Sequence, residues 1–179
     1  MEPADLVERV RSGVVQIALE TNGQKCDVGS GFMVEDGIVT NSHVLRAAGS
    51  PEAILFRPAD LDSGSCIRIP LADLKNHIEA ESGEALHDYA YLRIEDPLFQ
   101  ERHTFELSQS SALRVGERIA FLGFPFGMPQ LTAHVGYVSS LHQTRGINFI
   151  QIDGSVNGGN SGGPLLDPVS YTHLRAHET

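Results

Sequence analysis

Apolar residues along the chain recur mainly in short runs, and Gly, Pro, Asn, Asp or Ser bounds each run. Such runs are typical of β-strands, because helices of ordinary length need longer stretches with helical periodicity. The pattern predicts strands over Val14–Leu19, Ser30–Val34, Ile38–Thr40, Ala53–Arg57, Cys66–Ile69, Tyr89–Ile94, Arg118–Leu122, Leu131–Ser139 and Ile147–Ile152. We therefore expect an all-β protein.

Helix is predicted only over Ala4–Val10, whose apolar residues share one face, and in a short turn over Val44–Ala48 that Gly49 ends. A hairpin is predicted at Asp36-Gly37, between two apolar runs, because glycine takes the positive φ that a tight turn demands.

The alternating pattern fades between Asp96 and Gly116 and then resumes, which indicates a linker between two β units. We expect an N-terminal helical extension over 1–12, a first unit over 13–97, a linker over 98–112 and a second unit over 113–167. The number and spacing of the strands suit a pair of barrels or a sandwich, so the fold class alone leaves the function open.

Composition narrows the classes of partner. The chain carries 13 Lys and Arg against 23 Asp and Glu, a formal net charge of −10, which would repel a phosphate backbone, so we expect no nucleic-acid partner. No apolar run is long enough to span a bilayer, and Met1–Glu8 lacks the layout of a secretory signal, so we expect a cytoplasmic protein.

Cys26 and Cys66 have no metal-ligand spacing and are interpreted as small, reduced core residues, with a disulfide left open.

The segment Gly158-Gly159-Asn160-Ser161-Gly162-Gly163-Pro164 is the strongest chemical signal. A nucleophilic serine must project from a tight turn beside backbone N–H groups that stabilise an oxyanion, and the flanking glycines permit that turn. Serine is a poor nucleophile at its ordinary pKa, so it needs a histidine as general base and a carboxylate that orients the histidine.

His43 follows the predicted strand after the hairpin, and Asp88 opens an apolar strand; these are the candidate base and acid. His87 adjoins Asp88, but adjacent residues on a strand point to opposite faces. The remaining candidates, His77, His103, His134 and His142, lie in contexts typical of a solvated surface.

The chain resembles the chymotrypsin-like serine peptidases, and more narrowly the HtrA (Deg) type, over roughly Gly13 to Asp167. The segments that carry the resemblance are Gly29-Ser30-Gly31-Phe32, Val39–Val44, His87–Ile94, Leu113–Gly127, Val135–Ser139 and Gly159–Pro164. The resemblance implies two trypsin-like β-barrels with the catalytic groups between them. His43 would be the general base, Asp88 would orient it, Ser161 would attack the peptide carbonyl, and Gly159, Asn160 and Ser161 would form the oxyanion hole.

Family resemblance also implies polypeptide substrates, a homotrimer, and no cofactor or metal. Ser155 would line the base of the primary pocket, which predicts cleavage after small or medium apolar residues; the alternative is a loop serine away from the pocket. His173 and His177 have helical i, i+4 spacing, but two ligands without a third favour surface residues over a metal site.

After Asp167 the sequence departs from the family pattern. Two further barrel strands are expected there, whereas residues 168–179 resemble translated adaptor or vector sequence. We therefore expect a non-native tail, a second barrel that is incomplete at its C-terminal end, and a chain truncated after the nucleophile motif. The competing interpretations are a catalytically inactive peptide-binding module of the trypsin fold and a fragment without function of its own.

Overall fold

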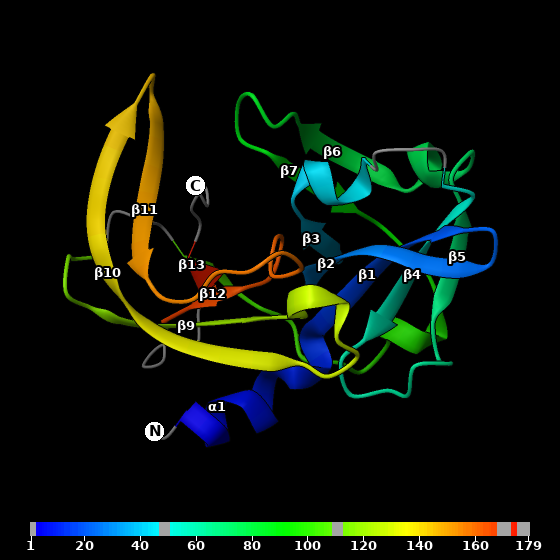
Figure 1. The fold of residues 1–179 in the computed structure, drawn as a ribbon, viewed down its shortest axis with the longest axis horizontal. Coiled ribbons are helices and arrows are strands. Elements are labelled where there is room, and N and C mark those ends of the chain that lie inside the picture. Colours follow the sequence, from blue (N-terminus) through cyan, green and yellow to red (C-terminus); the bar gives the residue numbers. More distant parts are fainter. Residues whose placement is uncertain (1–2, 47–50, 109–112, 168–172, 175–179) are drawn as a thin grey trace.

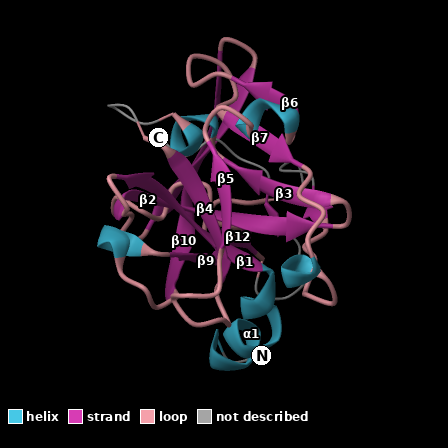
Figure 2. Cartoon of the chain, turned by 90° about the vertical axis from the view of Figure 1, so that its right-hand side faces the viewer, coloured by secondary structure: helices cyan, strands magenta, loops and turns pink. Residues whose placement is uncertain are grey.

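The computed structural model describes residues 3–46, 51–108, 113–167 and 173–174 of the 179-residue chain. It contains a seven-stranded and a six-stranded sheet, which lie side by side in Figure 1. A short N-terminal helix lies below both sheets in that view, and Figure 2 shows how little of the chain is helical. The structure is therefore almost entirely β, as the sequence pattern predicts.

The first sheet has the strand order β5-β4-β1-β2-β3-β7-β6, and every pair of neighbours is antiparallel. Its strands are β1 (Val14–Thr21), β2 (Gln24–Val34), β3 (Gly37–Thr40), β4 (Ala53–Pro58), β5 (Ile67–Pro70), β6 (Ile78–Ser82) and β7 (Tyr89–Leu92). Because most neighbours in the sheet are also neighbours in sequence, short turns suffice to connect them.

The second sheet has the order β11-β10-β9-β12-β13-β8, and only β13 and β8 pair in parallel. Its strands are β8 (Leu107–Ser108), β9 (Arg118–Gly123), β10 (Thr132–Thr144), β11 (Ile147–Asp153), β12 (Leu165–Leu166) and β13 (His173–Leu174). Within the described part of the chain no pairing joins β11 to β8, so this sheet is curled but open. The second barrel is incomplete, as expected.

Helical segments are short and lie at the ends of strands. They are α1 (Pro3–Val10) and the 3-10 turns η1 (Arg11–Gly13), η2 (Ser42–Leu45), η3 (Leu74–Asn76), η4 (Pro97–Phe99) and η6 (Pro125–Gly127). The predicted helix is confirmed as α1. The predicted turn after His43 is present as η2, but residues 47–50 lie outside the described part of the chain.

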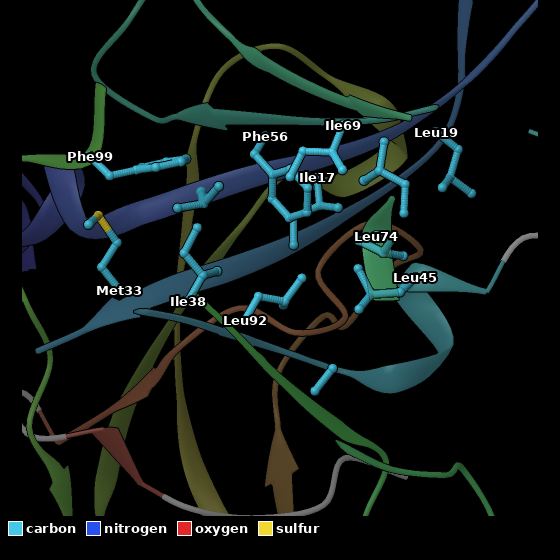
Figure 3. Packing of buried hydrophobic residues seen from close by; sticks show 13 residues of the cluster. Ile17, Leu19, Met33, Ile38, Leu45, Phe56, Ile69, Leu74, Leu92 and Phe99 are labelled. Atoms are coloured by element: carbon cyan, nitrogen blue, oxygen red, sulfur yellow. The ribbon is translucent and has the colours of Figure 1, made fainter. Parts of the chain in front are cut away.

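The first sheet encloses the largest of three apolar cores, whose side chains point toward one another in Figure 3. Alternate residues of β1 face this core, because successive side chains of a strand point to opposite faces. The core is formed by Val15, Ile17, Leu19, Met33, Ile38, Leu45, Ile54, Phe56, Ile69, Leu74, Ala90, Leu92 and Phe99.

An interface core joins the two sheets and α1. It contains Leu6 and Val10 of the helix together with Val14, Phe32, Ala59, Phe105, Ala120, Leu122, Phe124 and Leu166. The core inside the second sheet is smaller and consists of Leu113, Ile119, Phe121, Val138, Ile150 and Leu165. The helix therefore covers the junction rather than either sheet alone.

All the strands predicted from apolar runs are present, with ends shifted by a few residues. Strand β6 was not predicted, because most of Ile78–Ser82 is polar and exposed and leaves no apolar alternation. The two-residue strands β8 and β13 lie within the segments expected as a linker and a non-native tail, where Leu107 pairs with His173. The expected domain boundaries stay predictions.

The hairpin between β2 and β3 is confirmed, but the reason given for its glycine is wrong. Val34 pairs with Gly37, so the turn residues are Glu35 and Asp36, and Gly37 does not adopt a positive φ. A Cβ on Gly37 would come within 2.2 Å of the Leu92 carbonyl oxygen on β7. Close approach of a neighbouring strand, not turn geometry, requires glycine here.

The interpretation of both cysteines as buried core residues is also wrong. Cys26 is exposed, Cys66 is half-buried, and both are free thiols. The Cys26 thiol lies 3.4 Å from the Thr21 hydroxyl, near the turn that joins β1 to β2. Cys26 pairs with Leu19, next to a register shift between Ala18 and Leu19 in this strand pair.

Candidate active site

The register of the first sheet brings His43 and Asp88 together. Strands β3 and β7 are antiparallel, and Thr40 at the end of β3 pairs with Ala90 near the start of β7. The residues after β3 and the residue before β7 therefore share one edge of the sheet. His43 lies in η2 just after β3, and Asp88 immediately precedes β7.

Asp88 holds His43 through both of its carboxylate oxygens. Its Oδ2 lies 2.6 Å from His43 Nδ1, and its Oδ1 accepts a hydrogen bond of 3.0 Å from the His43 backbone N–H. The Asp88 side chain is 12% exposed and that of His43 is 40% exposed. A well-buried acid thus holds the Nδ1 edge of the imidazole, while the half-exposed ring still lines the cavity.

Asp88 adopts a positive φ of 42°, which is uncommon for a residue other than glycine. Surrounding bonds hold it in this conformation: its N–H donates to the Gly83 carbonyl at 3.1 Å, and its carbonyl accepts from Asn41 Nδ2 at 2.8 Å. Asp88 therefore belongs to the turn before β7, not to the strand. His87 beside it is exposed, and its backbone N–H donates to the Ser82 hydroxyl.

Ser161 lies in the loop between β11 and β12, and hydrogen bonds hold each successive carbonyl of this loop. The Gly158 carbonyl accepts from Phe126 N–H at 2.7 Å, and the Asn160 carbonyl accepts from Gly163 N–H at 3.0 Å. The carbonyls of Gly159 and Ser161 accept from the hydroxyl and the backbone N–H of Ser30, at 2.7 and 2.8 Å. Hydrogen bonds therefore fix four successive peptides of this loop, which we call the nucleophile loop because it carries the candidate nucleophile Ser161.

Two glycines of this loop are required by geometry. Gly159 has a φ of 102°, and a Cβ on it would come within 2.2 Å of the Phe124 carbonyl oxygen. Gly162 has a φ of 83°, and a Cβ on it would come within 2.2 Å of the Ser30 carbonyl oxygen. Any other residue would be strained and would clash with backbone at both positions.

The backbone N–H groups of Gly159 and Ser161 are left available by this arrangement. Because trans peptides point their carbonyl and the following N–H in opposite directions, anchoring the carbonyls of Gly158 and Asn160 turns these two N–H groups the other way. Within the described residues neither group donates a hydrogen bond to the protein. Asn160 N–H, in contrast, donates to the Asn157 carbonyl at 3.1 Å.

One cavity of about 600 Å³ contains all three candidate catalytic residues. It is lined by Asn41, His43, Glu84, Ala85, Leu86, Asp88, Thr144, Arg145, Ile147, Phe149, Val156 and Ser161. These residues come from the β6–β7 loop and η2 on one side and from the β10–β11 hairpin and the nucleophile loop on the other. The cavity therefore lies between the first and second sheets.

The predicted site residues occupy different positions relative to this cavity. Ser155 is exposed and is not among the cavity-lining residues, whereas its neighbour Val156 lines the cavity. Asn160 is 2% exposed behind the loop, and neither polar atom of its side chain has a hydrogen-bond partner among the described residues. Asn160 thus contributes a backbone turn rather than a cavity-facing amide.

Two histidines interpreted as solvated surface residues are partly buried instead. His103 and His134 each bury Nε2 without a hydrogen-bond partner in the described structure, and His134 stacks on Phe121 with ring centroids 4.7 Å apart. Burial lowers the pKa of His103, and the positive charge of Arg9 lowers it further. His142 is exposed, as expected, whereas His77 is half-buried, which also departs from that interpretation. Both buried imidazoles lie outside the cavity lining.

The described residues contain no group of three or more His, Cys, Asp or Glu side chains arranged to hold a metal ion. They also contain no helix long and apolar enough to cross a membrane. His177, which stands four residues after His173 in the i, i+4 pair considered above, lies outside the described part of the chain.

Sequence reasoning missed several residues of the site. Ser30 anchors the nucleophile loop, Asn41 holds the backbone of Asp88, and Leu86 lines the cavity. Ser30 and Asn41 lie in the motifs that carried the family resemblance, so their positions were visible but their roles were not. Leu86 stands in a polar loop with no recognisable motif.

A comparison with family profiles matches residues 29–170 to the trypsin-like peptidase domain. The matched region covers most of the chain and contains His43, Asp88 and Ser161. The chain belongs to this family, the trypsin-like peptidases.

Curated relatives narrow the family. Serine protease HTRA4 of Mus musculus is 34% identical over 92% of this chain and 34% of its own length. Protease Do-like 5, chloroplastic, of Arabidopsis thaliana is 32% identical over 86% of this chain and 48% of its own length. The periplasmic serine endoprotease DegP of Salmonella typhimurium is 31% identical over 78% of this chain and 27% of its own length. Within its family the chain is of the HtrA/Deg type, and it spans between about a quarter and a half of the length of these relatives.

Solved structures agree on the fold. The HtrA-type protease AlgW, determined with a tripeptide, superposes with a TM-score of 0.73 at 24% sequence identity. The match covers 97% of this chain and 52% of that one. This similarity supports the chymotrypsin-like architecture of the two sheets.

Proposed function

We propose that the protein is a serine endopeptidase that cleaves peptide bonds through His43, Asp88 and Ser161. The single observation that carries this proposal is their convergence at one cavity, with Asp88 Oδ2 2.6 Å from His43 Nδ1 and Ser161 lining the same cavity. The residues come from separate elements, so no local structural requirement explains why they meet. A nucleophile, a base and an orienting acid are the parts that acyl transfer needs.

In the proposed reaction Ser161 Oγ attacks the peptide carbonyl carbon and its proton passes to His43 Nε2. Asp88 holds the Nδ1–H tautomer and stabilises the imidazolium that forms. The tetrahedral intermediate then breaks its C–N bond, and the leaving amine takes the proton from His43. Water repeats the sequence on the acyl-enzyme ester, which releases the carboxylic acid and restores Ser161.

The N–H groups of Gly159 and Ser161 are the proposed oxyanion donors. Their support is the anchoring of the preceding carbonyls, which turns both N–H groups away from the protein acceptors around the loop. Asn160 shapes the turn between them. Removal of one such donor typically costs about 3 kcal/mol of transition-state stabilisation.

Cleavage after small or medium apolar residues is proposed from the cavity lining. Ile147, Phe149 and Val156 offer apolar surface beside Ser161, and Arg145 on the same wall would repel a basic side chain. Ser155 is not among the cavity-lining residues, so the lining itself, and not Ser155, supports this specificity. We expect faster turnover of a reporter peptide with Val or Ala before the scissile bond than of one with Arg or Lys, and the reverse order would overturn this specificity.

A fluorophosphonate probe tests the proposed chemistry, because it reacts with an activated serine. We expect labelling of the wild-type chain, complete loss of labelling in Ser161→Ala, and wild-type labelling in Ser63→Ala, which removes an exposed serine. A folded wild-type chain that is not labelled would contradict the peptidase and favour a peptide-binding module. The expected trimer and cytoplasmic location stay predictions that this test does not address.

A further inference from the structure

Ser30 is fully buried on β2 and contacts the nucleophile loop through both its side chain and its backbone. Its hydroxyl donates to the Gly159 carbonyl at 2.7 Å. Its backbone N–H donates to the Ser161 carbonyl at 2.8 Å. One residue of the first sheet therefore holds the peptides on both sides of Asn160 and Ser161.

The direction of the Ser30 hydroxyl is determined by its neighbours. The backbone N–H of Phe124 can only donate, so the hydroxyl oxygen accepts that bond, at 3.1 Å. The single hydroxyl hydrogen is then directed at the Gly159 carbonyl, which can only accept. Thr40 Oγ1 donates to the Ser30 carbonyl at 2.7 Å and completes the set. Ser30 thus links β3, the end of β9 and the nucleophile loop.

The nucleophile loop needs such an anchor because of its composition. Gly158, Gly159 and Gly162 give it a wide range of accessible backbone conformations, only a few of which present two N–H groups to one point. The Gly159–Asn160 peptide lies between the two peptides that carry the N–H groups of Gly159 and Ser161. Its rotation would break the bond from Asn160 N–H to the Asn157 carbonyl and displace both neighbouring peptides. A buried, charge-free hydroxyl whose single hydrogen has one available acceptor favours one of these conformations.

We propose that Ser30 is a positioning residue for the oxyanion hole. It acts by holding the Gly159 carbonyl so that the N–H groups of Gly159 and Ser161 point at the same place. The inference rests on the proposed peptidase function and goes beyond it, because it assigns a role to a residue that does not line the cavity.

The test compares Ser30→Ala with the wild-type chain in two kinetic measurements. The rate of fluorophosphonate labelling should fall by about 10- to 100-fold, less than the loss on deleting an oxyanion donor outright, because both donors remain but are misplaced. In peptide hydrolysis the loss should appear in kcat, with KM little changed, because the oxyanion forms only after binding.

Inhibitor affinity separates positioning from general loosening. A peptide aldehyde forms a hemiacetal with Ser161 whose oxygen occupies the oxyanion position, whereas the matching peptide alcohol cannot form one. Ser30→Ala should weaken the aldehyde by the same factor as kcat/KM and leave the alcohol unchanged. Equal weakening of both would show a merely structural role and overturn the proposal.

Ser12→Ala is the matched control, because it also removes a serine hydroxyl that accepts a backbone N–H, here from His103 at 3.1 Å. Its labelling rate and aldehyde affinity should equal those of the wild type. If Ser30→Ala does not fold, Ser30→Cys retains a weak donor of similar size and should give an intermediate rate. Wild-type kinetics in a folded Ser30 variant would refute the role of Ser30, whereas an unlabelled wild-type chain would refute the peptidase itself.

Discussion

The two sheets differ in how much apolar surface they bury. The first sheet surrounds the largest core, and Leu71 and Leu86 are its exposed large apolar side chains among the described residues. From residue 100 onward the described chain exposes Leu107, Val115, Phe126, Met128, Val135, Tyr137, Leu141 and Val156. Burial of apolar surface is the main stabilising contribution to a fold, so we expect the first sheet to be the more stable of the two.

The candidate site residues are divided between the two sheets. His43 and Asp88 both belong to the first sheet, where paired strands set their separation. Ser161 follows a strand of the second sheet, yet its loop is held from the first sheet by Ser30. The loop of the candidate nucleophile is therefore held from both sides: Ser30 of the first sheet bonds the Gly159 and Ser161 carbonyls, and Phe126, after β9 of the second sheet, bonds the Gly158 carbonyl.

The largest expected effect comes from truncating matched core residues in the two sheets. Ile17→Ala, at 1% exposure in β1, should lower the free energy of unfolding by about 4 kcal/mol, and Ile150→Ala in β11 by about 2 kcal/mol. Both delete the same atoms, but β1 is paired on both sides, whereas β11 has only β10 beside it in the described structure and can relax. Urea denaturation followed by circular dichroism measures both; equal losses would show that the two cores are equally well packed.

An intermediate loss of stability is expected on substitution of Arg57, whose side chain connects the two sheets. Its guanidinium is buried, donates to Leu61 and Pro129 carbonyls at 2.6 and 2.5 Å, and shares two bonds with Gln16 Oε1. Arg57→Leu should lower the free energy of unfolding by about 3 kcal/mol, because the buried carbonyl acceptors lose their hydrogen-bond donors.

Arg57→Lys is the control for this change, since it retains the positive charge without the planar fork and should restore part of the lost stability. Hydrogen exchange should show faster exchange in the segment around Met128 and Pro129 in Arg57→Leu. Unchanged exchange there would mean that Arg57 stabilises the first sheet alone.

The smallest expected effect is a pH dependence at the interface core. Its histidine, His103, packs edge-on against Phe105, and its pKa lies below the ordinary value of 6.5 because burial and the Arg9 charge disfavour protonation. The unfolded chain therefore binds a proton more readily, so the free energy of unfolding should fall as the pH drops below about 6.5. Urea denaturation between about pH 5.5 and 7.5 measures this slope.

His103→Gln removes the titrating group and should flatten the slope by the share that His103 contributes. The chain contains seven other histidines, so the difference in slope between wild type and variant is the relevant quantity. An identical slope in both proteins would exclude His103 as its origin.

Local pattern predicted most of the strands because alternation and turn residues act over a few positions. It failed where the strand is polar, as in Ile78–Ser82, and where a residue near a hairpin turn is exposed, as at Cys26. Gly37 shows the same limit, since its requirement comes from Leu92 on a neighbouring strand. The motifs of the candidate site were recognisable from sequence because each is a contiguous run of unusual composition.

The sequence alone determined the succession of strands, the chemical types at the site and the family to which they point, since each depends on residues close together along the chain. Only the tertiary structure decided that Asp88 meets His43 across a strand pair and that Ser30 holds the loop of Ser161. Those contacts join segments far apart in sequence. Their geometry depends on the register, twist and packing of whole sheets, which no short segment encodes.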